Sequence, residues 1–205
     1  MGLFDEDGKT CRLVQQKGKL VATLGSKGVL SFLEILYLMD ASKLALFKVK
    51  PDTLPTTTTT TTMMTCDKIC GQGIPISFQQ LLDQYTSYRD LHLFHVFKYL
   101  RNMGYHCLEG GAEEFDFKVY APSASFRKSN PATKPIKLIK VITEQELKST
   151  SHLKNRILSK IRIGGDQEED DKEDDDKLSP FITLALTQGN QISFIDLEPH
   201  SFEFD

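Results

Sequence analysis

The sequence predicts an α/β protein, of the α+β kind, in which a mixed sheet is flanked by helices. Apolar Phe115, Phe117 and Val119 alternate with polar residues, which is the period of a strand with one buried face. Residues 136–142 are rich in β-branched side chains and predict a second strand. Residues 77–103 carry the longest helical pattern of the chain. Strands and helices mixed in this way predict helices packed on a sheet.

The first part of the chain predicts a small α+β module. Residues 11–25 alternate loosely and predict a short hairpin, and residues 44–49 predict a strand. Between them, Ser31 and Glu34 have the spacing of a capping box, which predicts a helix beginning at residue 32.

Composition predicts the domain boundaries. A run of seven threonines follows two prolines and has no face that could pack. We therefore expect an N-terminal module at 1–55, a Thr-rich linker or insertion at 56–76, and a C-terminal domain at 77–205.

The C-terminal domain is expected to begin with helix. Ser77 and Gln80 form a second capping-box pattern, and the periodicity weakens over 86–90, so one helix or two fit equally well. Gly104 follows this helical segment and is the residue type that most often ends a helix. A third capping box, Thr143 with Glu146, predicts helix reaching to Ile161, either continuous or broken near residues 149–151. Residues 181–187 and 192–197 predict a closing hairpin.

Charge is distributed unevenly along the chain. The net charge is −3, but an acidic loop at 166–176 holds nine acids and one lysine, and the rest has 24 basic and 19 acidic residues, or +5. Between residues 118 and 140 there is no acid. That segment contains six cations: Lys118, Arg127, Lys128, Lys134, Lys137 and Lys140. A basic, proline-bounded loop beside a sheet suits a phosphate-bearing partner.

Several functional classes find no support in the sequence. The four cysteines are irregularly spaced, which predicts free thiols and no zinc site, and we expect no cofactor. No apolar run approaches the roughly 20 residues that cross a bilayer, so we expect no membrane span. The acidic N-terminus predicts no secretory signal.

One catalytic pattern offers an alternative. Asp116 and Lys118, with Glu109 upstream, have the acid-x-lysine spacing of a metal-dependent nuclease, in which carboxylates hold Mg²⁺ and the lysine stabilises the phosphate. The same spacing arises by chance on the polar face of any alternating strand.

Several strings together resemble the tRNA-splicing endonuclease family, and within it the large non-catalytic subunit of the eukaryotic complex. They are Gly104-Tyr105 after a helix, Phe115-Asp116-Phe117-Lys118-Val119-Tyr120, Phe126-Arg127-Lys128-Ser129-Asn130-Pro131, the closing hairpin, and the N-terminal segments 18–25 and 31–39. The resemblance implies a tRNA-intron-endonuclease-like (restriction-endonuclease-like) C-terminal domain.

The resemblance also implies a four-subunit enzyme that removes introns from precursor tRNA, containing two catalytic subunits, one small structural subunit and this chain. Family members that cleave use a tyrosine, a histidine and a lysine. Here residues 110–114 contain no tyrosine, and no histidine lies between His106 and His152. Lys177 alone has no proton-transfer partner, so the resemblance implies an inactive subunit. Its compartment would be the nucleus, or the cytoplasmic face of mitochondria as in some yeasts.

The expected sites follow from these considerations. The candidate RNA contacts are Arg127, Lys128, Lys134, Lys137 and Lys140. In the family, terminal strands of neighbouring subunits pair edge to edge, which makes Ile192, Phe194, Ile195 and Leu197 the candidate partner interface. Two other functions remain open: a self-sufficient metal-dependent nuclease using Glu109, Asp116 and Lys118, and a basic RNA-binding module that joins no complex.

Overall fold

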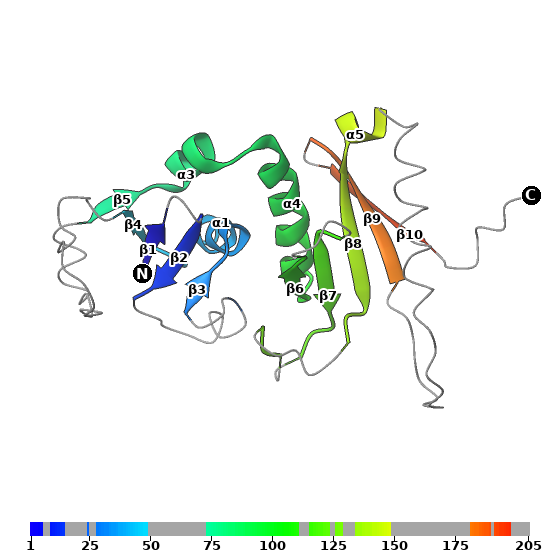
Figure 1. The fold of residues 1–205 in the computed structure, drawn as a ribbon, viewed down its shortest axis with the longest axis horizontal. Helices are drawn as coiled ribbons and strands as arrows, with labels where there is room; N and C mark the ends of the chain where they lie inside the picture. Colours follow the sequence, from blue (N-terminus) through cyan, green and yellow to red (C-terminus); the bar gives the residue numbers. More distant parts are fainter. Residues whose placement is uncertain are drawn as a thin grey trace, which may run out of the picture. The chain divides into compact units, whose positions relative to one another are not determined.

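The predicted mixture of sheet and helix is confirmed by a computed structural model. It describes residues 1–5, 9–14, 24, 28–48, 73–110, 115–123, 126–128, 134–148, 181–189 and 191–197. Within these ranges the chain is α+β, with two five-stranded mixed sheets and four helices (Figure 1). It divides into two compact units, Met1–Phe94 with Ser125–Ala132, and His95–Ala124 with Thr133–Asp205.

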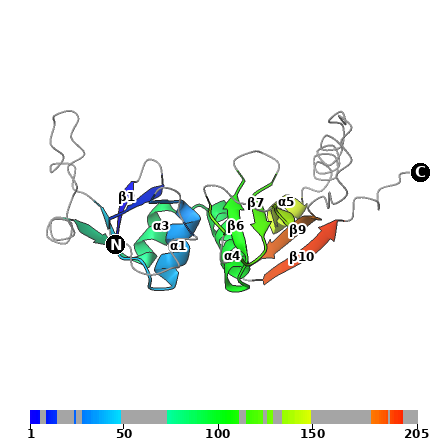
Figure 2. The same cartoon turned by 90° about the horizontal axis from the view of Figure 1, so that it is seen from below.

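The sheet of the first unit has the strand order β3-β2-β1-β4-β5. The strands are β1 (Gly2–Asp5), β2 (Thr10–Leu13), β3 (Val29–Leu30), β4 (Leu46–Lys48) and β5 (Ile74–Ile76). Only β1 and β4 pair in parallel; the other neighbours are antiparallel. The helices α1 (Phe32–Asp40) and α3 (Phe78–Tyr85) pack side by side (Figure 2). The ring of Phe4 on β1 meets that of Tyr85 on α3 at 5.0 Å, so α3 lies on the core face of the sheet.

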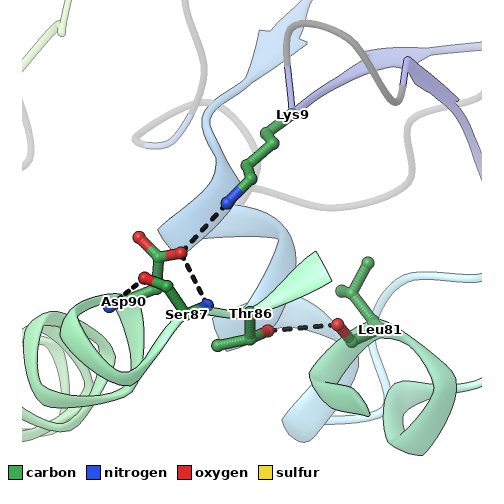
Figure 3. A network of polar contacts seen from close by, with 5 residues as sticks. All are labelled: Lys9, Leu81, Thr86, Ser87 and Asp90. Carbon is green, nitrogen blue, oxygen red and sulfur yellow. Dashed lines mark hydrogen bonds and ion pairs between the residues drawn. The ribbon is translucent and has the colours of Figure 1, made fainter. Parts of the chain in front are cut away.

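Two helices, not one, fill residues 77–103. The capping boxes at Ser31 and Ser77 begin α1 and α3 as predicted. The hydroxyl of Thr86 donates to the carbonyl of Leu81 at the end of α3. Ser87 and Asp90 then bond reciprocally, side chain to backbone, and begin α4 (Tyr88–Asn102) (Figure 3). Side chains of 86–90 therefore satisfy backbone groups at two helix ends, which explains the weak apolar pattern there.

The cap of α4 is also an ion-pair site within the first unit. The ammonium of Lys9 lies 3.1 Å from a carboxylate oxygen of Asp90 (Figure 3). The same ammonium lies 5.0 Å from the ring centre of Phe32. Burial alone would raise the pKa of Asp90, but hydrogen bonds from Ser87 and Lys9 outweigh it and hold that pKa below its usual value. This network ties the β1–β2 turn to the start of α4.

The sheet of the second unit has the order β10-β9-β8-β7-β6 (Figure 1). Its strands are β6 (His106–Glu109), β7 (Phe117–Tyr120), β8 (Lys137–Thr143), β9 (Phe181–Gln188) and β10 (Gln191–Leu197). The strands predicted near 115–120 and 136–142 and the closing hairpin are confirmed, and only β8 and β9 pair in parallel. Thr143 and Glu146 cap the short helix α5 (Glu144–Lys148). The rest of that predicted helix, the threonine run and the acidic loop lie outside the described residues.

Helix α4 packs on one face of this second sheet. The Phe97 ring lies 6.1 Å from that of fully buried Phe117 on β7, and the Tyr99 ring lies 5.3 Å from Phe194 on β10. Gly104 ends the helix region with a positive φ of 89°, the left-handed conformation that glycine adopts at low cost. No helix in the described part of the chain is both long and apolar enough to cross a membrane.

The boundary between the two compact units falls inside α4. β5 lies in the segment 56–76 that composition predicts as a linker or insertion, and it pairs with β4 in the sheet of the first unit. The β7–β8 connection also contributes Ser125–Ala132 to the first unit.

Candidate functional site

The five predicted RNA-contacting cations do not form one surface within a single unit. Arg127 and Lys128 belong to the first unit, and Lys134, Lys137 and Lys140 belong to the second. Because side chains alternate along a strand, Lys137 and Lys140 project from opposite faces of β8. The contacts of each cation therefore have to be considered separately.

Lys128 is bound to a buried carboxylate. Its ammonium lies 2.8 Å from one carboxylate oxygen of Glu34, whose side chain is 1% exposed, and Lys128 itself is only 19% exposed. The second oxygen of Glu34 accepts the backbone N–H of Ser31 at 2.9 Å. One carboxylate thus caps α1 and holds the 126–128 segment. The ion pair with Glu34 gives Lys128 a role in holding the fold, which explains this cation without any contact to RNA.

Lys137 and Lys140 also contact acids. Lys137 on β8 donates at 2.8 Å to both carboxylate oxygens of Asp196 on β10, and Thr183 on β9 donates to the same carboxylate at 2.5 Å. The hydrogen bonds from Lys137 and then Thr183 hold the pKa of Asp196 below its usual value. Lys140 lies 3.6 Å from Asp116. These two lysines therefore cross-link strands of the sheet.

Arg127 and Lys134 are the two exposed members of the predicted set. Arg127 follows Phe126, which is buried, and its guanidinium donates to the Phe126 carbonyl at 2.9 Å. Of the sequence-predicted cations, these two present the most surface to solvent.

The three residues of the metal-nuclease alternative are not brought to one place. Glu109 is opposite Phe117 in the register, so it lies on the face that α4 covers, whereas Lys118 projects from the other face. A carboxylate oxygen of Asp116 accepts the N–H of Val141 at 2.8 Å, and the Asp116 N–H donates to the carbonyl of Ile139. The described residues contain no group of three or more metal-binding side chains.

Asp116 therefore has a structural role immediately before β7 begins at Phe117. Its carboxylate accepts the N–H of Val141 on β8. Val141 lies two residues beyond Ile139, where the pairing of β7 with β8 stops. Replacing Asp116 by alanine should lower the free energy of unfolding by about 1–3 kcal/mol, because the Val141 N–H loses its partner. Urea unfolding followed by circular dichroism measures this loss.

Lys118→Ala is the matched control for Asp116→Ala. Lys118 is exposed on the same strand, so its replacement should change stability by less than about 0.5 kcal/mol. Mg²⁺-dependent RNA cleavage by the purified chain that disappeared in Asp116→Ala, with stability unchanged, would contradict the structural role and favour the nuclease.

The predicted partner interface lies on the edge strand of the second sheet. β10 pairs with β9 on one side and, among the residues that the structure describes, is the last strand on the other. Ile192 and Phe194 share a face with the α4 contact, while Ile195, 45% exposed, and Leu197 project from the opposite face. The strand thus carries apolar side chains on both faces along an edge that can accept another strand.

The hairpin register shows which backbone groups of β10 point outward. Gln188 pairs with Gln191 around a two-residue turn, and that closing pair is hydrogen-bonded in such hairpins. Hydrogen-bonded and non-bonded pairs then alternate. The N–H and C=O groups of Ile192, Phe194 and Asp196 therefore face away from β9 and are placed to pair with a further strand.

His106 is structural in this arrangement. Its Nδ1 lies 3.1 Å from the Arg101 guanidinium, and its Nε2 lies 3.0 Å from the carbonyl oxygen of Ser123 and 3.3 Å from the backbone nitrogen of the same residue. Burial, and secondarily the Arg101 charge, lowers the pKa of His106. A neutral ring held at both nitrogens joins the end of α4 to the residues after β7.

Two residues of these sites were not found by sequence reasoning. Glu34 was noted only as a capping residue, because its partner lies 94 positions away. Tyr99 lies in the apolar part of the helical pattern, and it is 45% exposed beside Phe194. The hydroxyl group of tyrosine favours a partly exposed position, and this is the feature of the sequence that indicates an interface residue here. No protein-family model matches the chain, and no curated protein matches it significantly.

Proposed function

We propose that this chain is the non-catalytic structural subunit of a tRNA-splicing endonuclease. In this proposal it assembles with two catalytic subunits and one small structural subunit, and it places precursor tRNA for intron excision. It performs no cleavage itself, and its compartment is the nucleus, or the cytoplasmic face of mitochondria as in some yeasts.

The observation that carries the proposal is the edge of β10. An edge strand with apolar side chains and outward-facing backbone groups is a liability unless a partner pairs with it. The Tyr99–Phe194 contact adds an aromatic surface from α4 beside this edge. Together they suit a strand from another subunit, with main-chain bonds supplying affinity and alternate side chains supplying specificity. The resemblance in sequence supplies the identity of that partner.

Affinity purification of the tagged chain, with identification of the proteins recovered, tests the proposal. The expected result is recovery of catalytic endonuclease subunits. Phe194→Pro should reduce that recovery at least tenfold, because proline removes an outward N–H that a partner strand needs. The fold should survive, since prolines are tolerated on edge strands where the N–H does not face the neighbour.

Phe194→Ala is the control, because it removes the ring and keeps the N–H. It should recover clearly more partner than Phe194→Pro when circular dichroism shows both variants folded. Equal recovery by both would reject edge pairing at β10. Absence of endonuclease subunits from the wild-type purification would reject the proposed function itself.

A further inference from the structure

We infer that Lys137 is a positioning residue for assembly: by neutralising Asp196 it leaves the edge of β10 open to pairing with a strand of another endonuclease subunit. The inference rests on the proposed function for the identity of that subunit. It gives Lys137 a role in assembly in place of the RNA contact predicted from the sequence.

The first step is that Asp196 lies where an incoming strand would pair. It is the only charged residue of β10, and its backbone N–H and C=O face away from β9. A strand that paired with β10 would therefore place a residue opposite Asp196, with the two Cβ atoms about 4.5–5.5 Å apart. The carboxylate would then lie beside that residue, on the face of β10 that also carries Phe194.

The second step is that a charge at this place guards an edge strand. Charged side chains on edge strands are one of the means by which natural sheets avoid pairing with another chain. A carboxylate covered by an incoming strand loses water, and this loss is unfavourable unless a cation and hydrogen-bond donors replace that water. Asp196 by itself would therefore oppose the docking that the apolar side chains of β10 favour.

The third step is that Asp196 already has such donors. The ammonium of Lys137, on β8, lies 2.8 Å from both carboxylate oxygens, and the hydroxyl of Thr183, on β9, donates to one of them. Thr183 is directly opposite Asp196 in the register, and the three side chains project from the same face of the sheet. The carboxylate is thus neutralised before a partner strand arrives.

The fourth step concerns the size of the effect. In the chain alone the side chains of Lys137 and Asp196 are 33% and 49% exposed, so water and salt screen their attraction. An incoming strand would cover the pair and remove part of that screening. Truncating one member of a covered charge pair is far more costly than truncating one at an exposed surface. Replacing Lys137 should therefore weaken assembly much more than it destabilises the fold.

The experiment measures recovery of catalytic endonuclease subunits with the tagged full-length chain from nuclease-treated cell extract. Lys137→Met should lower that recovery about tenfold or more, because Asp196 would be covered as an uncompensated carboxylate. Lys137→Arg keeps a cation that can bind both carboxylate oxygens, so it should retain most of the recovery.

Rescue separates this role from a general effect on the sheet. Lys137→Met combined with Asp196→Asn removes both charges and keeps an amide oxygen for the Thr183 hydroxyl, so recovery should return to near the wild-type level. Lys140→Met is the matched control. Lys140 is also on β8, is also 33% exposed and has a carboxylate neighbour in Asp116, but it projects from the other face of the sheet. Its replacement should leave recovery unchanged.

Two results would overturn the inference while the proposed function stands, provided that circular dichroism shows the variants folded. One is a Lys137→Met chain that recovers catalytic subunits as the wild type does. The other is a loss of recovery that Asp196→Asn does not restore, which would mean that Lys137 acts through another ligand, such as RNA. Absence of endonuclease subunits from the wild-type purification would instead reject the proposed function, and this inference with it.

Discussion

Replacing Lys128 by methionine should lower the free energy of unfolding by about 3 kcal/mol, at the lower end of what removing one member of a buried ion pair costs. The reason is that Glu34 stays behind as a carboxylate that is 1% exposed and has lost its ammonium. The partial exposure of Lys128, 19%, argues for the lower end. Denaturant unfolding, with hydrogen exchange of the α1 amides as a local probe, measures the effect.

The control for this prediction is Lys137→Met. The Lys137–Asp196 pair has side chains 33% and 49% exposed, so water and salt screen it, and its loss should cost less than about 1 kcal/mol. A Glu34→Gln, Lys128→Met double variant should recover part of the stability lost in Lys128→Met, because no buried charge remains. If Lys128→Met is no less stable than Lys137→Met, Lys128 does not hold the segment.

Replacing Phe117 by alanine should lower the free energy of unfolding by about 3–5 kcal/mol, the range found for large aromatic residues in cores. Phe117 is fully buried on β7, between β6 and β8 of the second sheet, and its ring lies 6.1 Å from that of Phe97 on α4. The variant therefore loses the apolar surface that joins helix to sheet and leaves a cavity there.

Phe117→Leu is the conservative partner of Phe117→Ala, because it keeps most of the apolar volume and should retain much of the stability. Calorimetric or urea unfolding of both variants provides the comparison. A loss below about 1 kcal/mol in Phe117→Ala would show that α4 does not depend on this contact.

The elements predicted well from sequence are those whose signals are local. The capping boxes at Ser31, Ser77 and Thr143 each lie within four consecutive residues, and each begins a helix in the structure. The closing hairpin was also predictable from the sequence, because two apolar segments are joined by a turn that contains Gly189. Gly189 has a positive φ in the structure.

The elements that were missed depend on partners far along the chain. β1 and β5 are four and three residues long, too short to show a period, and β5 contains Pro75. β1 pairs with β2 and β4, and β5 pairs with β4, so both strands depend on partners elsewhere in the chain. Composition therefore places β5 within the Thr-rich linker or insertion at 56–76.

The candidate site was predictable in composition but not in its contacts. The sequence shows six cations without an acid between residues 118 and 140, and this favours a phosphate-bearing partner. It does not show that carboxylates from distant segments, Glu34 and Asp196, approach two of those cations. A segment that contains cations and no acids in the sequence therefore does not show how much positive charge remains unneutralised at the surface of the folded chain.

The β7–β8 connection has a consequence for synthesis and for dissection of the molecule. Glu34 is made 94 residues before the lysine that neutralises it, so a nascent chain has to carry that carboxylate without its ammonium until the second sheet is already being synthesised. A fragment cut at Phe94 would stay in that immature condition permanently, because Ser125–Ala132 completes the unit.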